Sequence, residues 1–567
     1  MTTATPEVLA EFLEIEHRSP DLDAILSLRD DALRNYFDDF HREISGSDEY
    51  TRDEFPVPVA ESGQEMHTGM GHDLIEDAVN HISPEHIQIE VPPRGNRGRS
   101  VAERQAKWMR GAWHRMQQEH GPIVRQWIRD AVRYDLGVLK ILFTADMWPD
   151  RPPVPEEGES NAEYRDKIDE IEDERRIVWP FIPQNVNPAD LIWDTSTNGP
   201  HWFIQTYEIS INEVKARFPD WIPVMNSATQ GNIVFTEYWD EQWAAYLVDN
   251  DFVMEPREHG YPFPPFIFAE GGQGDLTSRI PKYRYTGMLR YKYQLLDEEA
   301  RLMSQADTLV RQYSWPSRVF QGDPDEVQTV MNDWDSTPGA NNFLPEGVTQ
   351  SWDIPPGTPT DVQAMLSTVV AKIERGTVPA VASGAFEPNL RSGNTVAIRA
   401  GLARLKLDSI AGGVARGIQR ANALLLGLVE DVVRGRVTVW GDTAISQFTE
   451  TLGPRDIRGH RATIVRLSAT SPEDQSQRLA DAINGKRAGI FSQLEAKTRA
   501  GVLNPLEDEE QRFAELILNS PQMLQLIVQS AAQKANLLPQ LGVDPQDPAS
   551  SMTQPGEQQA NAGRFVG

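Results

Sequence analysis

The sequence predicts an α+β fold with several domains. Three observations support this prediction. Apolar residues recur at helical spacing through most of the first 134 positions, β-branched and aromatic runs dominate residues 177–270, and helical spacing returns after residue 285. With 567 residues the chain has room for two to four domains, and its hydrophobic fraction of 39% is enough to build real cores, so global disorder is excluded.

The N-terminal part is expected to be helical and to lead into one strand. Apolar residues at helical spacing in the first 45 residues predict helices there, and the same pattern predicts helices at 65–82, 101–118 and 122–134. A β-rich run at 137–143 predicts the strand. The last of these helices is expected to turn five apolar residues inward: Val124, Trp127, Ile128, Ala131 and Val132.

An exposed insertion separates this part from the β-rich part. Residues 149–176 open with a run of prolines and acidic residues, and an acidic helical pattern follows at 161–176, which is typical of a solvated arm. A short helix is expected at 211–218, with Ser210 as its N-cap. Around it we expect four strands, at 177–179, 202–207, 233–239 and 243–248.

Two helices then flank a short irregular stretch. Helical spacing predicts helices at 285–313 and 359–376, and the residues between them, 314–358, are punctuated by Pro and Gly with short β-like runs. A loop rich in Gly, Ser, Pro and Asn covers 383–394. The longest helix is expected at 395–433, about 60 Å long at ~1.5 Å per residue, with five glycines that weaken it and invite a bend.

The C-terminal part is expected to be helical and to end in a disordered tail. Short strands at 436–440 and 462–467 precede it. The tail begins at Pro539 and is rich in Gln, Pro, Gly, Ala and Ser. The helices are expected at 472–485, 487–500, 507–518 and 520–535.

Composition excludes several kinds of chemistry. The chain has no cysteine, so disulfides, thiolate metal sites and thiol nucleophiles are excluded. It lacks a run of 18 apolar residues and a secretion signal, so neither a membrane span nor export is expected. The net charge is −30, from 84 acidic and 54 basic residues. This charge has two interpretations: simple solubility, or a surface that meets DNA without gripping its phosphates.

One cluster resembles a set of metal ligands. It contains His67, His72, Glu76, Asp77 and His81, and two of these, Asp77 and His81, are four residues apart and share a helix face. A metal site needs three or four convergent ligands, and the spacing differs from the H-E-x-x-H motif. An ordinary, partly exposed helix face is therefore the favoured interpretation.

The search for a catalytic motif fails. The glycines of residues 271–274 resemble a phosphate-binding loop, but the P-loop lysine is missing. The chain also lacks a nucleophile elbow, and carboxylate pairs such as Asp333 and Asp335 carry little information in so acidic a sequence. We therefore expect no cofactor and no enzymatic activity, and we favour a structural or interaction role.

The order of these elements resembles that of phage portal proteins over roughly residues 10–535. Four stretches carry the resemblance, by their order and spacing together: a glycine before a strand at 134–141, a Pro/Asn-rich turn before D-L-I-W-D at 181–194, a Pro-Phe-rich strand at 261–268, and an R-S-G-N-T segment at 391–395 that opens the long helix. The insertion at 149–176 departs from the family pattern.

The resemblance implies a portal fold with named parts. Residues 1–284 would form the wing, 285–313 and 359–376 the two stem helices, and 314–358 a small α/β clip. Residues 377–394 would contain the tunnel loop. The long helix and return to the wing would take 395–469, the helical crown 470–538 and the tail 539–567.

The resemblance also implies a function and partners. The chain would form a ring of twelve copies at one capsid vertex, through which double-stranded DNA passes non-specifically during packaging and ejection. Its partners would be the large subunit of terminase, a head–tail adaptor, and the major capsid and scaffolding proteins. Its location would be the virion, and the host cytoplasm during assembly, with no membrane contact.

Site residues follow from these assignments. The tunnel loop would contribute Phe386, Glu387, Asn389, Arg391 and Ser392, whose two charges cancel. Arg391 would touch a phosphate transiently or pair with Glu387, and both interpretations stay open.

Three tryptophans in the clip, Trp315, Trp334 and Trp352, would contact neighbouring subunits and docking partners, or would form a small local core. Two other functions remain as alternatives: another oligomeric phage protein of the tail or baseplate, and a metal-dependent hydrolase or nuclease with a diffuse carboxylate site.

Overall fold

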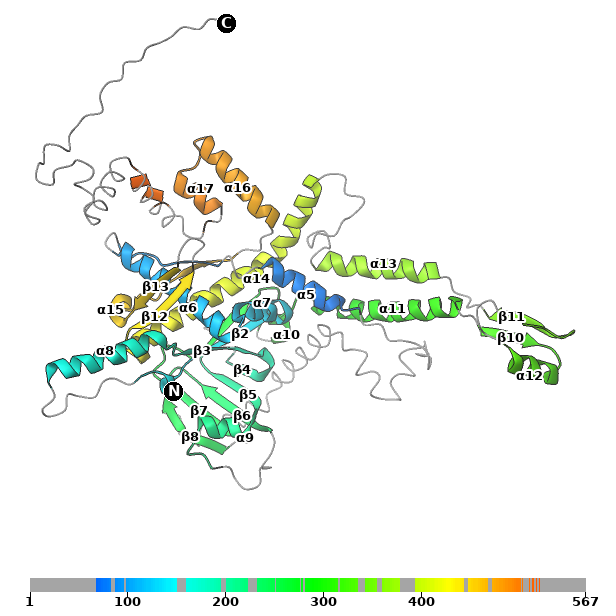
Figure 1. Cartoon of the computed structure of the whole chain (residues 1–567), viewed down its shortest axis with the longest axis horizontal. Helices are drawn as coiled ribbons and strands as arrows, with labels where there is room; N and C mark the ends of the chain where they lie inside the picture. Colours follow the sequence, from blue (N-terminus) through cyan, green and yellow to red (C-terminus); the bar gives the residue numbers. More distant parts are fainter. Residues whose placement is uncertain are drawn as a thin grey trace, which may run out of the picture. The chain divides into compact units, whose positions relative to one another are not determined.

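The computed structural model shows an α+β fold that divides into two compact units, residues 1–470 and 471–567 (Figure 1). Each unit is described separately. The residues that the structure describes are 68–82, 87–95, 98–149, 160–194, 200–222, 232–249, 251–275, 277–278, 281–314, 317–334, 342–353, 359–377, 393–442, 447–467 and 472–500, together with 502, 509, 512, 513, 516, 517 and 520. The helices expected in the first 45 residues, at 507–518 and at 520–535, and the tail, lie wholly or largely outside them.

The centre of the first unit is a helical layer. It consists of α5 (Met70–His81), α6 (Arg99–His120), α7 (Ile123–Tyr134) and the long α14 (Gly393–Gly427). All five apolar residues that the sequence turns inward on α7 are buried, as expected. Full burial of one large apolar side chain stabilises the fold by about 1.5–3 kcal/mol. Because this layer buries many such side chains, including Trp127, it is a main source of stability.

Glycine allows α14 to lie directly on a strand. A Cβ atom at Gly413 would lie 1.7 Å from the carbonyl oxygen of Glu270, the last residue of β9 (Phe266–Glu270). The sequence predicts that the glycines of this helix weaken it. The helix nevertheless runs without interruption over 35 residues and then continues as a π-helical segment, Leu428–Val433. At least at Gly413, the missing side chain serves close packing.

A three-stranded antiparallel sheet packs on this layer in the order β3–β2–β9. Its central strand is β2 (Leu136–Phe143), and β3 is Phe181–Val186. The prediction of a strand at 177–179 is wrong. Instead, α8 (Asn161–Ile177) extends through Ile177, because the backbone N–H of Val178 still bonds to the carbonyl of Glu174, and the strand begins four residues after the helix ends.

A second, five-stranded antiparallel sheet follows in the order β4–β5–β6–β7–β8. Three of its strands, β5, β6 and β7, lie where the sequence predicts strands, and α9 (Ile211–Arg217) is capped by Ser210, whose hydroxyl accepts from the N–H of Glu213. The strands are β4 (Leu191–Trp193), β5 (Phe203–Ser210), β6 (Asn232–Trp239), β7 (Trp243–Val248) and β8 (Asp251–Glu258).

A buried ion pair joins the two sheets. Lys140 of β2 and Glu237 of β6 are both buried, with 2.5 Å between Nζ and Oε2. Gln205 also accepts from Lys140, while Tyr207 and Trp239 donate to the Glu237 carboxylate at 2.8 and 3.1 Å. Burial alone would raise the pKa of Glu237, but the Lys140 ammonium and these donors hold that pKa below its usual range.

Two short sheets lie in the body of the first unit. β1 (Gln88–Glu90) pairs with β14 (Ile464–Arg466), and β12 (Val437–Asp442) pairs with β13 (Gln447–Leu452). The β1–β14 pairing brings residues near position 90 beside residues near 465. Among the described residues, we find no helix long and apolar enough to cross a membrane.

In the second unit, α16 (Pro472–Arg487) confirms the helix expected at 472–485. The helix expected at 487–500 is shorter than predicted. It begins only at Gln493 and ends at Arg499, because Gly489 adopts a positive φ of 71° and Ser492 caps α17 through the N–H of Glu495.

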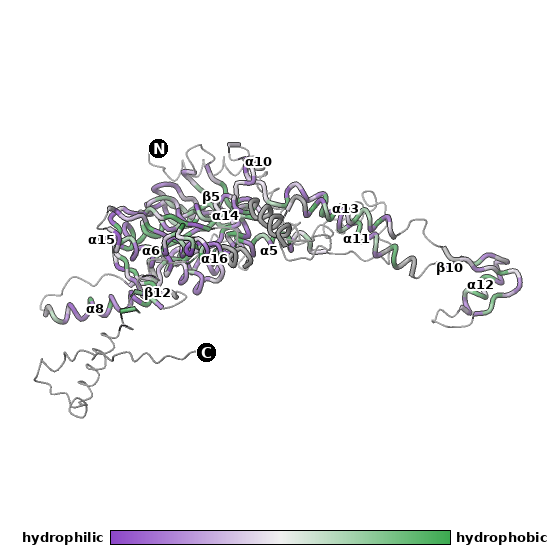
Figure 2. Tube along the Cα trace, turned by 90° about the horizontal axis from the view of Figure 1, so that it is seen from above, coloured by the Kyte–Doolittle hydropathy of each residue, from purple (hydrophilic) through white to green (hydrophobic). Residues whose placement is uncertain are grey.

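An arm of two antiparallel helices belongs to the first unit. α11 (Tyr293–Ser314) and α13 (Pro359–Gly376) lie side by side in both Figure 1 and Figure 2. β10 (Ser317–Gln321), α12 (Pro324–Asp333) and β11 (Thr349–Asp353) follow at their distal end (Figure 1). α13 has the bounds that the sequence predicts. α11 begins eight residues later than the predicted 285, after a four-residue helix, α10 (Pro281–Arg284), and a 3₁₀ turn.

Tertiary hydrogen bonds explain the late start of α11. The N–H of Thr286 bonds to the Asp135 carboxylate at 3.1 Å, and the N–H of Met288 bonds to the carbonyl of Val132. A Cβ atom at Gly287 would lie 1.9 Å from the carbonyl oxygen of Arg133. This segment therefore docks on the end of α7 instead of forming helical i→i−4 bonds.

Candidate functional site

The base of the arm is fixed in the core of the first unit. Lys292, just before α11, donates from Nζ to the carbonyl of Lys372 near the end of α13, which confirms that the helices run antiparallel. Leu296 on α11, and Val369 and Ile373 on α13, belong to the main buried cluster.

The distal half of the arm leaves apolar side chains in water. Val310 on α11 is 51% exposed and Met365 on α13 is 53% exposed. In the sequence, both residues lie closer to the segment that connects the two helices than Leu296, Val369 and Ile373 do. Exposed apolar side chains on paired helices mark a surface suited to contact with another protein.

A small module connects the two helices at the end of the arm. β10 (Ser317–Gln321) pairs antiparallel with β11 (Thr349–Asp353), and α12 (Pro324–Asp333) lies between them in sequence. Asp323 caps α12 by accepting from the N–H of Asp325 at 3.1 Å. This helix is absent from our sequence prediction, although Asp323 followed by Pro324 is a helix-start signal.

The three tryptophans predicted for the clip differ in their surroundings. Trp334 packs edge-on against Phe320, with ring centroids 5.1 Å apart, and the Arg318 guanidinium stacks on its face at 4.8 Å. Trp352 is placed by its backbone alone, opposite Arg318 in the β10–β11 pair, and Trp315 lies outside the described residues. Trp334 thus forms part of a local core, and a docking role for the three stays a prediction.

The most exposed apolar groups of this module are absent from our sequence prediction. Phe343 is 96% exposed, and Met331 on α12 is 62% exposed. A signal was present for Met331, since it follows buried Val330 on a short helix that has one buried face. Phe343 lies in a non-repetitive segment, where periodicity gives no information about exposure.

A buried carboxylate organises the junction at which the arm joins the body. Asp135, between α7 and β2, has φ of 64° and is fully buried. Its carboxylate accepts N–H bonds from Gln273, Gly274 and Thr286 at 2.9–3.1 Å. Burial raises the pKa of Asp135 to about 6, and the three N–H donors oppose that rise.

The glycine loop at 271–274 is therefore an anion cradle that the chain fills itself. A phosphate-binding loop points backbone N–H groups at a bound anion, and here the anion is the Asp135 side chain. The Ser409 hydroxyl of α14 donates to the carbonyl of Gly271 at 2.6 Å and ties the same loop to the long helix. Nucleotide binding at this loop is thus unsupported, as the sequence indicates.

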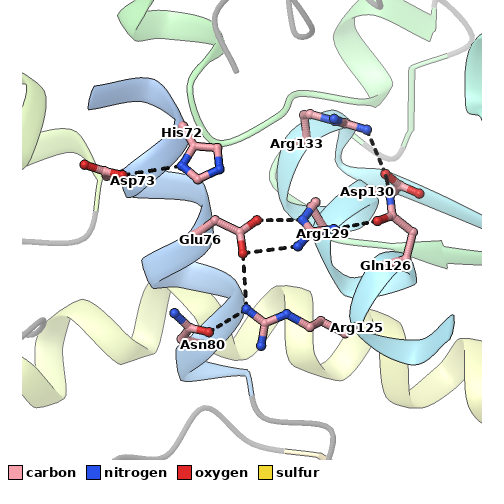
Figure 3. Close-up of polar contacts among 9 residues, drawn as sticks. All are labelled: His72, Asp73, Glu76, Asn80, Arg125, Gln126, Arg129, Asp130 and Arg133. Carbon is pink, nitrogen blue, oxygen red and sulfur yellow. Dashed lines mark hydrogen bonds and ion pairs between the residues drawn. The ribbon is translucent and has the colours of Figure 1, made fainter. Parts of the chain in front are cut away.

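On the α5 face that carries the predicted histidine cluster, the carboxylate of Glu76 binds two arginines of α7. Glu76 lies between Arg129, whose Nε donates at 2.6 Å, and Arg125, whose Nη2 donates at 3.1 Å (Figure 3). His72 instead faces the neighbouring Asp73. No group of three or more His, Asp or Glu side chains in the described part of the chain is placed to hold a metal ion, and His67 lies outside that part.

The same arginines tie α5 to α7. Arg125 also donates to Asn80 of α5 at 2.8 Å, whereas the bond from Arg133 to Asp130, at 2.9 Å, lies within α7 (Figure 3). Burial raises the pKa of Asp130 to about 6, against the opposing effect of Arg133 and Gln126. This network connects helices of the core and leaves Glu76 engaged, so a structural role is the simplest interpretation of the cluster.

The predicted tunnel-loop residues lie outside the described residues. They are Phe386, Glu387, Asn389, Arg391 and Ser392. The structure does place both ends of that segment, because α13 ends at Gly376 and α14 begins at Gly393.

Comparison with known proteins gives structural neighbours only. No family model matches the sequence, and no curated protein matches it. One similar solved structure is a chain from the virion of a native gene transfer agent particle, with a TM-score of 0.38 and 10% identity, covering 76% of this chain and 89% of that one. Another is a chain from the neck of an empty gene transfer agent particle, with a TM-score of 0.39 and 9% identity, covering 78% and 93%.

Proposed function

We propose that this chain is a portal subunit of a tailed phage or phage-like particle. The observation that carries the proposal is the order of elements in the arm: a helix, a small α/β module, an antiparallel return helix, and then a 16-residue segment that leads into a 35-residue helix. The two helices would form the stem, the module the clip, and the segment 377–392 the tunnel loop. The role is structural and involves no catalysis by this chain.

Ring closure is the first requirement of this role. Each subunit would contact its neighbours through two different surfaces, as in any closed heterologous ring. The exposed apolar residues Val310 and Met365 on the stem helices supply surface for such contacts. The net charge of −30 per subunit supports a channel that repels DNA phosphates and lets the duplex slide.

Partner docking is the second requirement. The module with Met331 and Phe343 exposed would receive the terminase motor, which supplies ATP hydrolysis, and later a head–tail adaptor. The wing would contact the capsid and scaffolding proteins. In this proposal the subunit acts in the host cytoplasm during assembly and in the virion afterwards.

Native mass spectrometry of the purified full chain, combined with class averages of negatively stained particles, tests the proposal. We expect a closed ring of about twelve subunits with a central hole. A monomer or dimer that persists when the chain is produced together with its scaffolding protein would overturn the proposal. A tail or baseplate protein would instead give a ring or fibre without a channel wide enough for a DNA duplex.

A further inference from the structure

A pocket of about 310 Å³ lies in the body of the first unit, and none of its lining residues belongs to the proposed stem helices or clip. Its floor is formed by the first two turns of α6, including Ala102 and Gln105. Its walls come from the segment after β1, with Arg94, and from the short helix α15 (Pro454–Ile457) and the turn that follows it. The β1–β14 pairing brings these distant segments together.

Three arginines line this pocket, namely Arg94, Arg455 and Arg458, and all three are exposed. Two of them donate to backbone carbonyls: Arg94 donates to the carbonyl of Arg458 at 3.0 Å, and Arg458 donates to that of Arg455 at 2.8 Å. His460 also lines the pocket and contacts the carbonyl of Pro92 at 2.7 Å. Such bonds orient the side chains, and within the described part of the chain no carboxylate forms an ion pair with these three guanidinium groups.

One carboxylate lines the same pocket and is already engaged. Asp456 lies 3.5 Å from Nη1 of Arg104 and accepts from the N–H of Gly453 at 3.1 Å. The lining therefore carries an excess of positive charge in a chain with 84 acidic and 54 basic residues. The average composition of this acidic chain does not explain why the pocket lining is positively charged.

We propose that this pocket binds a phosphate group of a DNA backbone. Planar guanidinium groups donate in forks that match phosphate oxygens, and the lining arginines come from two segments that are far apart in the sequence. A carboxylate of an acidic protein segment offers only two coplanar oxygens, so it would engage fewer of these donors. The first turn of α6 has no acidic residue, so the helix dipole adds to the arginines' attraction.

This inference goes beyond the proposed channel, because the site would hold DNA on the body of the subunit. The channel proposal calls for weak phosphate contact, whereas this pocket is built for a definite one. The two proposals fail separately, since ring mass and symmetry are measured without DNA and DNA binding is measured on whichever assembly the protein forms.

The test is fluorescence anisotropy with a short labelled DNA duplex and the full-length protein at several salt concentrations. The pocket variant is R94Q/R455Q. The matched control is R165Q/R176Q, which removes the same charge from two exposed arginines of α8. We expect the pocket variant to bind at least about tenfold more weakly, since a hydrogen bond to a charged group contributes about 1.5–3 kcal/mol and 1.4 kcal/mol is tenfold. The control should stay within about twofold of the unaltered protein.

Salt dependence supplies a second readout. The slope of log K against log salt should become shallower by about one in the pocket variant, because the contact with one phosphate is lost. Equal weakening of both variants, or no binding of DNA by the unaltered protein at low salt, would overturn the proposal. Displacement of the duplex by polyglutamate as effectively as by unlabelled DNA would also overturn it, in favour of an acidic protein segment.

Melting temperatures of all variants show that folding is intact. If R94Q/R455Q melts early, Arg455→Gln alone replaces it, because Arg94 is the member that bonds to the Arg458 carbonyl. The single variant should still weaken DNA binding about tenfold, and the slope should become shallower by no more than about one, because Arg94 still faces the phosphate. A single variant that folds and binds DNA normally would count against the pocket.

Discussion

At the scale of single residues, two buried carboxylates hold parts of the first unit together in different ways. Asp135 is satisfied by backbone N–H groups of a loop and of the segment that leads into α11. Glu237 is satisfied by a buried lysine and two aromatic donors that connect the two main sheets. In each case, loss of the charged group leaves buried donors without acceptors, and this cost exceeds the net value of the bonds themselves.

Asp135→Ala should lower the free energy of unfolding of the first unit by about 1–3 kcal/mol, because the N–H groups of Gln273, Gly274 and Thr286 lose their acceptor. Chemical denaturation measures this. Asp275→Ala in the adjoining segment is the control, because Asp275 is exposed and its loss should leave stability almost unchanged. Equal effects of the two substitutions would show that the Asp135 carboxylate has no special role in stability.

The pH dependence of this anchor has a definite sign. Its pKa is raised from 3.8 to about 6 by burial, so the folded state binds a proton more readily than the unfolded state. The contribution of this group to stability is therefore complete below about pH 4 and is lost as pH rises through about 6. The difference in unfolding free energy between the protein and Asp135→Asn should shrink across this window. A difference that is flat with pH would contradict the assignment.

Lys140→Met should cost about 3–5 kcal/mol, because it leaves the Glu237 carboxylate buried and unpaired. The double variant K140M/E237Q should recover more than half of that loss, since a neutral amide oxygen still accepts from Tyr207 and Trp239 without needing a counter-ion. Denaturation of the two single variants and the double variant completes the cycle. Additive losses would mean that the two residues act independently.

At the scale of elements, the sequence predicts those segments best whose ends carry local signals. α13 begins at Pro359 and ends at Gly376, as predicted, because a proline at the start and a glycine at the end fix the two boundaries locally. The start of α11 is missed because Thr286 and Met288 bond to residues some 150 positions earlier in the chain. The periodicity of a short stretch of sequence cannot reveal a hydrogen-bond partner that lies so far away in the chain.

The candidate sites show the same division. Trp334 is recognisable as an unusual residue in a short segment, but only the structure shows that Phe320 and Arg318 enclose it. The basic pocket is invisible in the sequence because Arg94 and Arg455 are far apart and meet through the β1–β14 pair.

A contrast between two aromatic residues tests how the end module is built. Trp→Ala in a core costs about 3–5 kcal/mol, and for half-buried Trp334 we expect about half of this, confined to the module. Hydrogen exchange should therefore show faster exchange in β10, α12 and β11 and unchanged protection in α7. Phe343→Ser should leave exchange unchanged, because Phe343 is 96% exposed. A global loss of protection in Trp334→Ala would show that the module does not fold as a separate element.

At the scale of the whole molecule, the distribution of exposed apolar surface matters more than the total charge. The charge of −30 keeps copies apart at long range, and salt of about 0.15 M screens this repulsion beyond about 8 Å. Assembly of the proposed ring would therefore depend on short-range contacts that remove apolar surface from water. The exposed apolar residues of the arm are candidates for these contacts.

Met365→Asp on α13 should shift the protein from rings to smaller species, because a charge would replace an apolar side chain that becomes buried between subunits in the proposed ring. Gln363→Asp is the control: it lies on the same helix, is also exposed and introduces the same charge. Native mass spectrometry at matched concentration measures both. The two variants should melt alike as separate subunits, since both positions are exposed in the subunit. If both assemble normally, this face of the arm lies outside the subunit interface, and the apolar groups of the distal arm then serve a partner other than a second copy.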